Sequence, residues 1–163
     1  LGPVTLLVNC ASVFENDSFS SMNRASWDAH LETNLRAPLI LAQAFARRLP
    51  EDREGLIVNI LDQRVFAPTP DFFSYSLSKS ALWAATQMLA KALAPRIRVN
   101  GVGPGPTLPS IHQQGSDFEE EVATTLLKRA VDPCEIAGAL TYLIDARSVT
   151  GQMIAVDAGQ HLA

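Results

Sequence analysis

Hydrophobic residues occur in short continuous runs that alternate with longer stretches of helical periodicity. Short apolar runs bounded by turn residues predict buried strands, and they lie at residues 4–8, 56–61, 97–102 and 153–156. The longer stretches between these runs predict three helices. Strands that alternate with helices are typical of a mostly parallel sheet covered by helices on both faces. The sequence therefore predicts an α/β fold with a doubly wound parallel sheet.

Proline and serine set the expected boundaries of the first two helices. We expect the first helix to begin with Ser26 as its N-cap and to continue through residue 49, because Pro50 then stops it. The second helix is predicted over residues 73–93 and ends before Pro95.

The third helix carries a complete set of start signals. Asp132 is the expected N-cap, Pro133 occupies the first helical position and Glu135 can complete a capping box. Before it, residues 103–117 form the longest irregular stretch, within a region of about residues 103–130. A stretch of this length in a compact domain is typical of a lid or a binding loop.

Composition and charge exclude several classes of protein. The chain has 163 residues, with 13 Lys+Arg against 17 Asp+Glu, a balance that leaves no basic surface for nucleic acid. No apolar run reaches the roughly 20 residues of a membrane span, so we expect no membrane partner. Cys10 and Cys134 are too few for a disulfide framework, which favours a reducing, cytoplasmic location. His30, His112 and His161 are not spaced as metal ligands, and we expect no metal site.

The candidate catalytic and binding residues directly follow the predicted strands. In parallel sheets, binding sites lie beyond the carboxyl ends of the strands. Residues 9–14 follow the first strand, Asp62 follows the second, and residues 103–107 follow the third. Tyr75 and Lys79 are four positions apart in the second helix, so they share one face. Because an ammonium group favours a phenolate, we expect Lys79 to lower the pKa of Tyr75 toward the range of a general acid.

Pro38 interrupts the first predicted helix. Because proline has no N–H, the carbonyl of Asn34, four residues earlier, loses its helical partner. The freed carbonyl can hold a water molecule in a proton relay. A purely structural kink is the alternative interpretation of the same proline.

These motifs resemble those of the short-chain dehydrogenase/reductase family, over residues 1–163. The Asn-Cys-Ala-Ser sequence at 9–12 is similar to the family's Asn-Asn-Ala-Gly turn, Asn34 to its active-site asparagine, and Tyr75 with Lys79 to its catalytic pair. The resemblance implies a Rossmann-like fold and hydride transfer with NAD(P). It also implies that Tyr75 donates the proton, that Lys79 binds the nicotinamide ribose, and that Asn34 orders a water molecule.

Two later segments extend this resemblance. Pro104-Gly105 with Thr107 resembles the loop that contacts the nicotinamide carboxamide, and Val-Asp-Ala-Gly at 156–159 resembles the family's closing Asp-Gly-Gly. The cofactor-binding residues that the resemblance implies are Asn9, Ala11, Ser12, Tyr75, Lys79, Pro104, Gly105 and Thr107.

Asp62 departs from the common family pattern, which has a serine thirteen residues before the tyrosine. An ionised carboxylate only accepts hydrogen bonds, whereas a protonated one is an acid. The aspartate resembles the pteridine reductase branch, which includes members that reduce dihydromonapterin and dihydrofolate. Phe14 lies where this branch stacks the pterin against the nicotinamide, and Ser12 where a serine bonds the pterin. The implied catalytic residues are Tyr75, Lys79, Asp62 and Asn34, and the implied substrate-binding residues are Ser12, Phe14, Asp62 and Tyr75.

The resemblance thus implies a reductase that transfers hydride to a ring C=N bond of a pterin or dihydropterin, with NADP(H) favoured over NAD(H). Two alternatives stay open: a short-chain reductase of a ketone or alcohol, and a degenerate nucleotide-binding protein in which Asp62 marks inactivation and Phe14 only anchors a loop. The resemblance also implies a homotetramer formed through the helices at 26–49 and 73–93. Finally, it implies a partial domain that begins at the fourth of seven strands, without the glycine-rich turn for the pyrophosphate.

Overall fold

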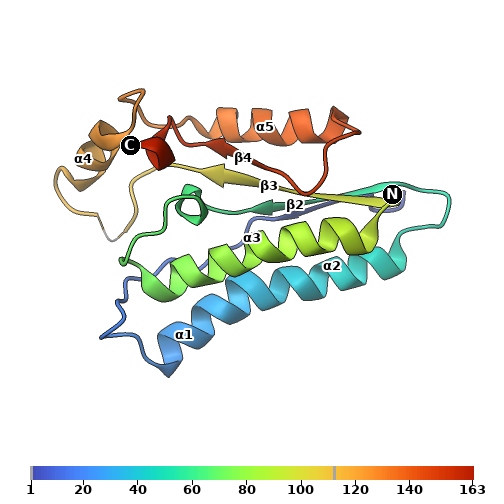
Figure 1. The fold of residues 1–163 in the computed structure, drawn as a ribbon, viewed down its shortest axis with the longest axis horizontal. Helices are drawn as coiled ribbons and strands as arrows, with labels where there is room; N and C mark the ends of the chain where they lie inside the picture. The colour runs from blue at the N-terminus through green and yellow to red at the C-terminus, as the bar shows by residue number, and fades with distance from the viewer. Residues whose placement is uncertain (1, 112) are drawn as a thin grey trace.

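The computed structural model describes residues 2–111 and 113–163, so His112 lies outside the described residues. Figure 1 shows three layers, with α1, α2 and α3 on one face of a sheet and α5 on the other. The sheet has four parallel strands in the order β1-β2-β3-β4. The strands are β1 (Leu6–Asn9), β2 (Gly55–Ile60), β3 (Ile97–Pro104) and β4 (Met153–Val156). The predicted α/β fold is therefore confirmed.

All four predicted strands are present; β4 has the predicted bounds, and the ends of the other three are shifted. β1 begins at Leu6 and ends at Asn9, whereas we expected residues 4–8. Val4 is 69% exposed and lies before the strand, because the β1–β2 ladder begins where Leu6 meets Leu56. β3 extends two residues beyond the prediction, as Pro104 pairs with Val156 of β4.

The first helix begins earlier than expected. α1 (Arg24–Leu31) is capped by Asn23, whose side-chain oxygen accepts the Ala25 and Ser26 amide N–H groups at 2.9 and 3.1 Å. Ser26 is therefore not the N-cap. Its hydroxyl accepts the Asn23 amide N–H at 3.2 Å and closes a capping box from the third helical position.

Pro38 does interrupt this helix, as predicted. A π-helical turn over Glu32–Arg36 separates α1 from α2 (Ala37–Arg48). The wider turn adjoins the proline, which cannot donate to the carbonyl of Asn34.

The other helices agree closely with the sequence pattern. The predicted bounds of α3 (Phe73–Leu93) are confirmed, and so is the Asp132 capping box of α5 (Pro133–Asp145). The irregular stretch after β3 contains one short helix, α4 (Asp117–Thr124). Short 3-10 turns cover Gln63–Val65 and Gln160–Leu162.

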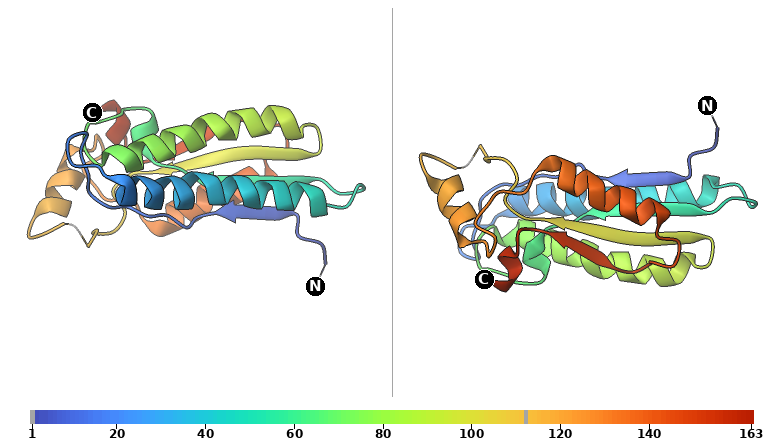
Figure 2. Two further views of the ribbon diagram at one scale, coloured as in Figure 1. Left: turned by 90° about the horizontal axis from the view of Figure 1, so that it is seen from below. Right: turned by 90° about the horizontal axis from the view of Figure 1, so that it is seen from above.

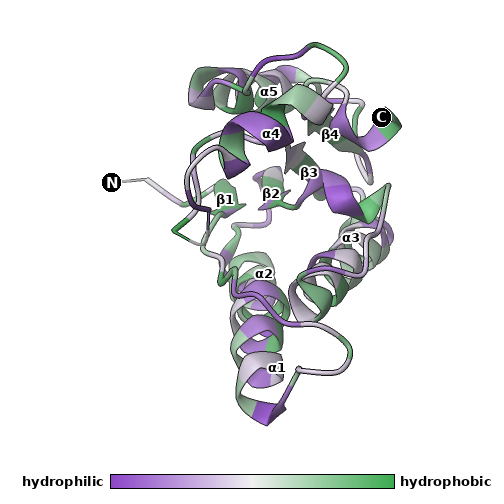
Figure 3. Cartoon of the chain, turned by 90° about the vertical axis from the view of Figure 1, so that its left-hand side faces the viewer, coloured by the Kyte–Doolittle hydropathy of each residue, from purple (hydrophilic) through white to green (hydrophobic). Residues whose placement is uncertain are grey.

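Two hydrophobic clusters hold the layers together. Ile57 of β2 faces α2 and α3, while its neighbours Leu56 and Val58 face α5, where Leu143 is fully buried. This alternation is expected for a strand covered on both faces. Figure 3 looks along the sheet and shows α5 on one side and α2 and α3 on the other.

The layers bring the carboxyl ends of the strands to one end of the molecule. Figures 1 and 2 show α4, the start of α3 and the C-terminus at this end. Among the described residues, no helix is long and apolar enough to cross a membrane. The same part of the chain contains no group of three His, Cys, Asp or Glu side chains placed to hold a metal ion.

Candidate active site

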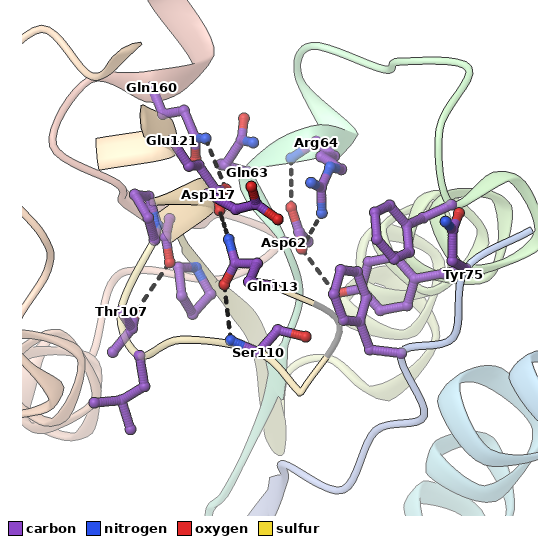
Figure 4. Close-up of a pocket in the computed structure, with 17 residues that line it drawn as sticks. Asp62, Gln63, Arg64, Tyr75, Thr107, Ser110, Gln113, Asp117, Glu121 and Gln160 are labelled. Carbon is purple, nitrogen blue, oxygen red and sulfur yellow. Dashed lines mark hydrogen bonds and ion pairs between the residues drawn. The ribbon is translucent and has the colours of Figure 1, made fainter. Parts of the chain in front are cut away.

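A cavity of about 410 Å³ lies beyond the carboxyl ends of β2 and β3. Six of the predicted site residues line it: Phe14, Asp62, Tyr75, Pro104, Gly105 and Thr107. Figure 4 shows Tyr75, Asp62 and Arg64 on one side of this space, and Gln113, Glu121 and Gln160 on the other. The predicted residues that do not line the cavity are Asn9, Ala11, Ser12, Asn34 and Lys79.

Asp62 and Tyr75 form a direct hydrogen bond. The Tyr75 hydroxyl donates to Asp62 Oδ2 at 2.7 Å, while Asp62 Oδ1 accepts the Arg64 amide N–H at 2.8 Å. The second bond caps the 3-10 turn after β2 and fixes the carboxylate. Tyr75 is only 6% exposed, so the pair is largely shielded from water. A hydrogen bond to a charged carboxylate is strong in such surroundings.

Burial raises the pKa of Tyr75 well above its ordinary value, and the charge of Asp62 and its hydrogen bond raise it further. Arg64 opposes this change. The direction is opposite to the one expected from the Tyr-x-x-x-Lys spacing. The reason is that burial disfavours the charged phenolate and that the Asp62 carboxylate, in direct contact with the phenol, further stabilises the protonated form. The Tyr75 hydroxyl is therefore held in its protonated form in this structure.

Lys79 lies one turn farther along α3 and is 3% exposed. Its Nζ donates to the Ile60 carbonyl at 2.9 Å and lies 5.7 Å from the Tyr75 ring centroid. Burial lowers the pKa of Lys79, although Asp62 and Cys10 partly oppose this. The ammonium group has three donors, so it can bind a further acceptor at the carboxyl end of β2.

Asn34 fixes the loop that follows β1. Its side-chain oxygen accepts the Val13 amide N–H at 2.8 Å, and its amide group donates to the Val13 carbonyl and to Ser78 Oγ at 2.9 and 3.0 Å. Ser12 Oγ also donates to Asn34, at 3.2 Å. Asn34 thereby joins the loop before Phe14 to α3, one turn from Tyr75.

Two phenylalanine rings form an aromatic wall beside Tyr75. Phe14 and Phe72 stack with their centroids 4.2 Å apart and their planes 12° apart, and Phe14 meets Tyr75 edge-on at 4.7 Å. The Arg64 guanidinium lies 5.6 Å from the Phe14 centroid and 5.4 Å from that of Phe72. Such a surface suits a flat heterocycle.

The loop after β3 closes another side of the cavity. Gly105 packs so tightly on Asp157 that a Cβ atom there would lie 2.7 Å from the Asp157 Cα. Asp157 is itself fixed, because its carboxylate accepts the amide N–H groups of Gly159 and His161 at 3.0 and 2.9 Å. Thr107 Oγ1 donates to the Gly105 carbonyl at 2.9 Å and still offers acceptor lone pairs. The segment thus presents a tightly packed polar edge to the cavity.

Glu121 joins the loop after β3 and α4 to the C-terminal turn. Its carboxylate accepts the side-chain amides of Gln113 at 2.7 Å and Gln160 at 3.1 Å. The three residues come from the loop after β3, from α4 and from the turn after β4, and all line the cavity.

The sequence interpretation did not identify five further residues of this region: Arg64, Phe72, Glu121, Gln160 and His30. Arg64 could have been found from its place two residues after Asp62, and Phe72 from its place at the start of α3. The other three depend on contacts between distant segments, which carry no local signal.

A family model described as "Enoyl-(Acyl carrier protein) reductase" matches residues 1–161. The human protein named "Dehydrogenase/reductase SDR family member 4" is 33% identical over 97% of this chain, which spans 60% of that relative. The "Nodulation protein G" of Azospirillum brasilense is 30% identical over 98% of the chain, and 67% of that protein is covered.

Solved structures show a higher similarity. FolM alternative dihydrofolate reductase 1 from Brucella suis, crystallised in complex with NADP, is 54% identical with a TM-score of 0.96. The match covers 99% of this chain and 66% of that one. The Brucella canis protein of the same name, also complexed with NADP, is 52% identical with a TM-score of 0.92, over 99% of this chain and 64% of that one.

Proposed function

Because this chain belongs to the short-chain dehydrogenase/reductase family, we propose that it is the catalytic part of an NADP(H)-dependent reductase of pterins or dihydropterins. The observation that carries this proposal is the 2.7 Å hydrogen bond from Tyr75 to Asp62 beside the Phe14–Phe72 wall. The similarity to dihydrofolate reductases of the FolM type supports the same substrate class.

The proposed reaction places a hydride on a ring carbon and a proton on the adjacent ring nitrogen. A bound reduced nicotinamide supplies the hydride. Tyr75 supplies the proton by turning its hydroxyl hydrogen from Asp62 toward the substrate nitrogen. Asp62 keeps this hydroxyl protonated and oriented before the transfer, and it takes up the next proton from solvent to restore Tyr75.

The substrate ring would stack on the aromatic wall. Phe14 is fixed from one side by Phe72 and meets Tyr75 edge-on, so a flat ring on this wall lies next to the proton donor. A planar heterocycle gains both burial and stacking there. A flexible acyl chain or a sugar gains only burial.

Four groups of this chain would hold the nicotinamide half of the cofactor. The Lys79 ammonium fits the ribose hydroxyls, while Thr107 and the backbone at Pro104 and Gly105 fit the carboxamide. The exposed backbone at residues 10–12 fits the remainder of the nucleotide, next to Asn9. NADP(H) is proposed in preference to NAD(H), since both FolM structures contain NADP.

The test is NADPH oxidation by the complete protein with dihydrobiopterin, dihydromonapterin and dihydrofolate. Turnover of at least one of them is expected, and Tyr75→Phe should abolish it. Leu127→Ala is a matched surface control, since Leu127 is 62% exposed and does not line the cavity. Absence of oxidation with every pterin refutes the proposal.

We further propose that the protein assembles as a homotetramer through α2 and α3 in the cytoplasm. Ile40, Leu41 and Met88 on these helices are 45%, 49% and 69% exposed, which leaves apolar surface for a partner copy. Cys10 and Cys134 are free thiols, as suits a reducing compartment. Light scattering on the complete protein tests the assembly, and a monomeric mass refutes it.

A further inference from the structure

We propose that Asp17, His30 and Ser74 form a positioning network that holds the Phe14–Phe72 wall against Tyr75 and thereby sets the affinity for a planar heterocycle. The inference rests on the proposed function and assigns a role to three buried polar residues outside the cavity.

His30 is the centre of this network and is fully buried in α1. Its Nε2 accepts the Glu15 amide N–H at 3.1 Å, so Nδ1 carries the hydrogen of the neutral ring. Nδ1 lies 2.7 Å from Ser74 Oγ and donates to it. Ser74 Oγ in turn donates to Asp17 Oδ2. The hydrogen bonds therefore run in one direction, from Glu15 of the loop through His30 of α1 and Ser74 of α3 back to Asp17 of the loop.

Asp17 joins the loop after β1 to helices α1 and α3 through hydrogen bonds. Its Oδ1 accepts the Ser74 amide N–H at 2.9 Å, and its Oδ2 accepts the Ser26 hydroxyl at 3.0 Å. The Asp17 carbonyl also accepts the Phe73 amide N–H at 3.1 Å. A loop residue 57 positions away thus caps α3 in place of the local N-cap residue.

The local N-cap residue of α3 is Phe72, and its backbone conformation is unusual for an N-cap. Phe72 has φ 50° and ψ 53°, a left-handed conformation that is rare for an aromatic residue, and its side chain makes no capping bond. With the extended backbone that is usual for an N-cap, serine, threonine or aspartate at this position would cap the helix directly. Because Asp17 supplies the cap, position 72 is available for a ring that stacks on Phe14.

The network holds the backbone next to both rings of the wall. Glu15 directly follows Phe14 in the chain, while Phe73 and Ser74 directly follow Phe72. Loss of one bond frees the loop relative to α3, and the wall then loses its fixed distance from Tyr75. Burying an aspartate and a histidine is unfavourable unless every polar atom is paired, so packing alone would be served better by apolar residues.

Ser74→Ala in the complete protein tests the proposal, with Thr86→Val as matched control. Thr86 is another fully buried hydroxyl of α3, three turns away and outside the cavity. Because a bond to a charged group is lost, Ser74→Ala should raise the KM for a dihydropterin about tenfold or more, with kcat changed by less than roughly twofold. Thr86→Val should leave this KM unchanged.

A double mutant separates positioning from general destabilisation. In a Phe14→Leu background, Ser74→Ala should add almost nothing to the KM, because the ring that the network positions is already absent. An unchanged KM in an active Ser74→Ala protein, or two effects that simply multiply, overturns the network's role. Absence of pterin turnover by the unaltered protein instead refutes the proposed function and, with it, this role.

Discussion

Asp62→Asn is expected to reverse the hydrogen bond between residue 62 and Tyr75. Asp62 Oδ1 accepts the Arg64 amide N–H at 2.8 Å, and Oδ2 accepts the Tyr75 hydroxyl at 2.7 Å. An asparagine has only one oxygen. When that oxygen keeps the Arg64 bond, the amide NH₂ group faces the Tyr75 oxygen and donates to it. Since a donor stabilises the phenolate, we expect the pKa of Tyr75 to fall.

The expected loss of activity follows from the bond that is removed. A hydrogen bond to a charged group contributes about 1.5–3 kcal/mol, and Tyr75 is nearly buried where it makes this one. If the bond orients the proton donor for the reaction, its loss lowers kcat/KM for reduction roughly 10–150-fold. An exposed pair would give a much smaller effect, because water replaces the lost partner.

The assay is the pH dependence of kcat/KM in the reductive direction. A proton donor is active while protonated, so the rate falls as the pH rises through its pKa. Because burial and Asp62 raise the pKa of Tyr75, the unaltered protein should keep its rate to high pH. Asp62→Asn should move this decline to lower pH, and Tyr75→Phe should show no turnover at any pH. A decline at the same or a higher pH in Asp62→Asn would refute the reasoning.

Three further predictions concern the cofactor loop, acid stability and the core. Gly105→Ala should weaken NADPH binding measured by fluorescence titration, because its Cβ would lie 2.7 Å from the Asp157 backbone, and unchanged affinity would contradict the tight packing. Burial raises the pKa of Asp17, but bonds from Ser74 and Ser26 outweigh it and the pKa is lowered. This stabilisation is complete above the ordinary value of 3.8 and is lost as the pH falls through the folded value. Urea unfolding of the unaltered protein should therefore show a lower free energy of unfolding once the pH falls below 3.8. In Asp17→Asn, this part of the pH dependence should be absent. Leu143→Ala should lower the free energy of unfolding by about 2–5 kcal/mol, since this side chain is fully buried, and a change below 1 kcal/mol contradicts it.

Most of the fold was predictable because its signals are local. The bounds of α3 follow from residues 73–93 alone, and the Asp132 cap follows from three neighbouring side chains. Ser26 was wrong as the first N-cap because Asn23, three residues earlier, offers an equally good capping oxygen. Both residues belong to one capping box, and the sequence pattern does not say which of them begins it.

The site residues that directly follow a strand were predictable from the sequence. Asp62 and Tyr75 were both expected at the site, and the structure brings them into contact, but the predicted effect of Lys79 on the pKa of Tyr75 was wrong. The i, i+4 spacing places Lys79 near the phenol, but burial and the contact with Asp62, thirteen residues away, raise the pKa of Tyr75. His30 could not be identified, since its partners Glu15 and Ser74 are brought to it by folding.

The central claim is that the Asp62–Tyr75 pair adapts a short-chain reductase site to a ring C=N bond. It is tested most directly by the ratio of kcat/KM for a dihydropterin to kcat/KM for a simple ketone, in the unaltered protein and in Asp62→Ser. The unaltered protein should strongly prefer the pterin, and Asp62→Ser should nearly abolish pterin turnover while ketone reduction rises. An unchanged ratio, or a pterin preference that increases in Asp62→Ser, would contradict the claim.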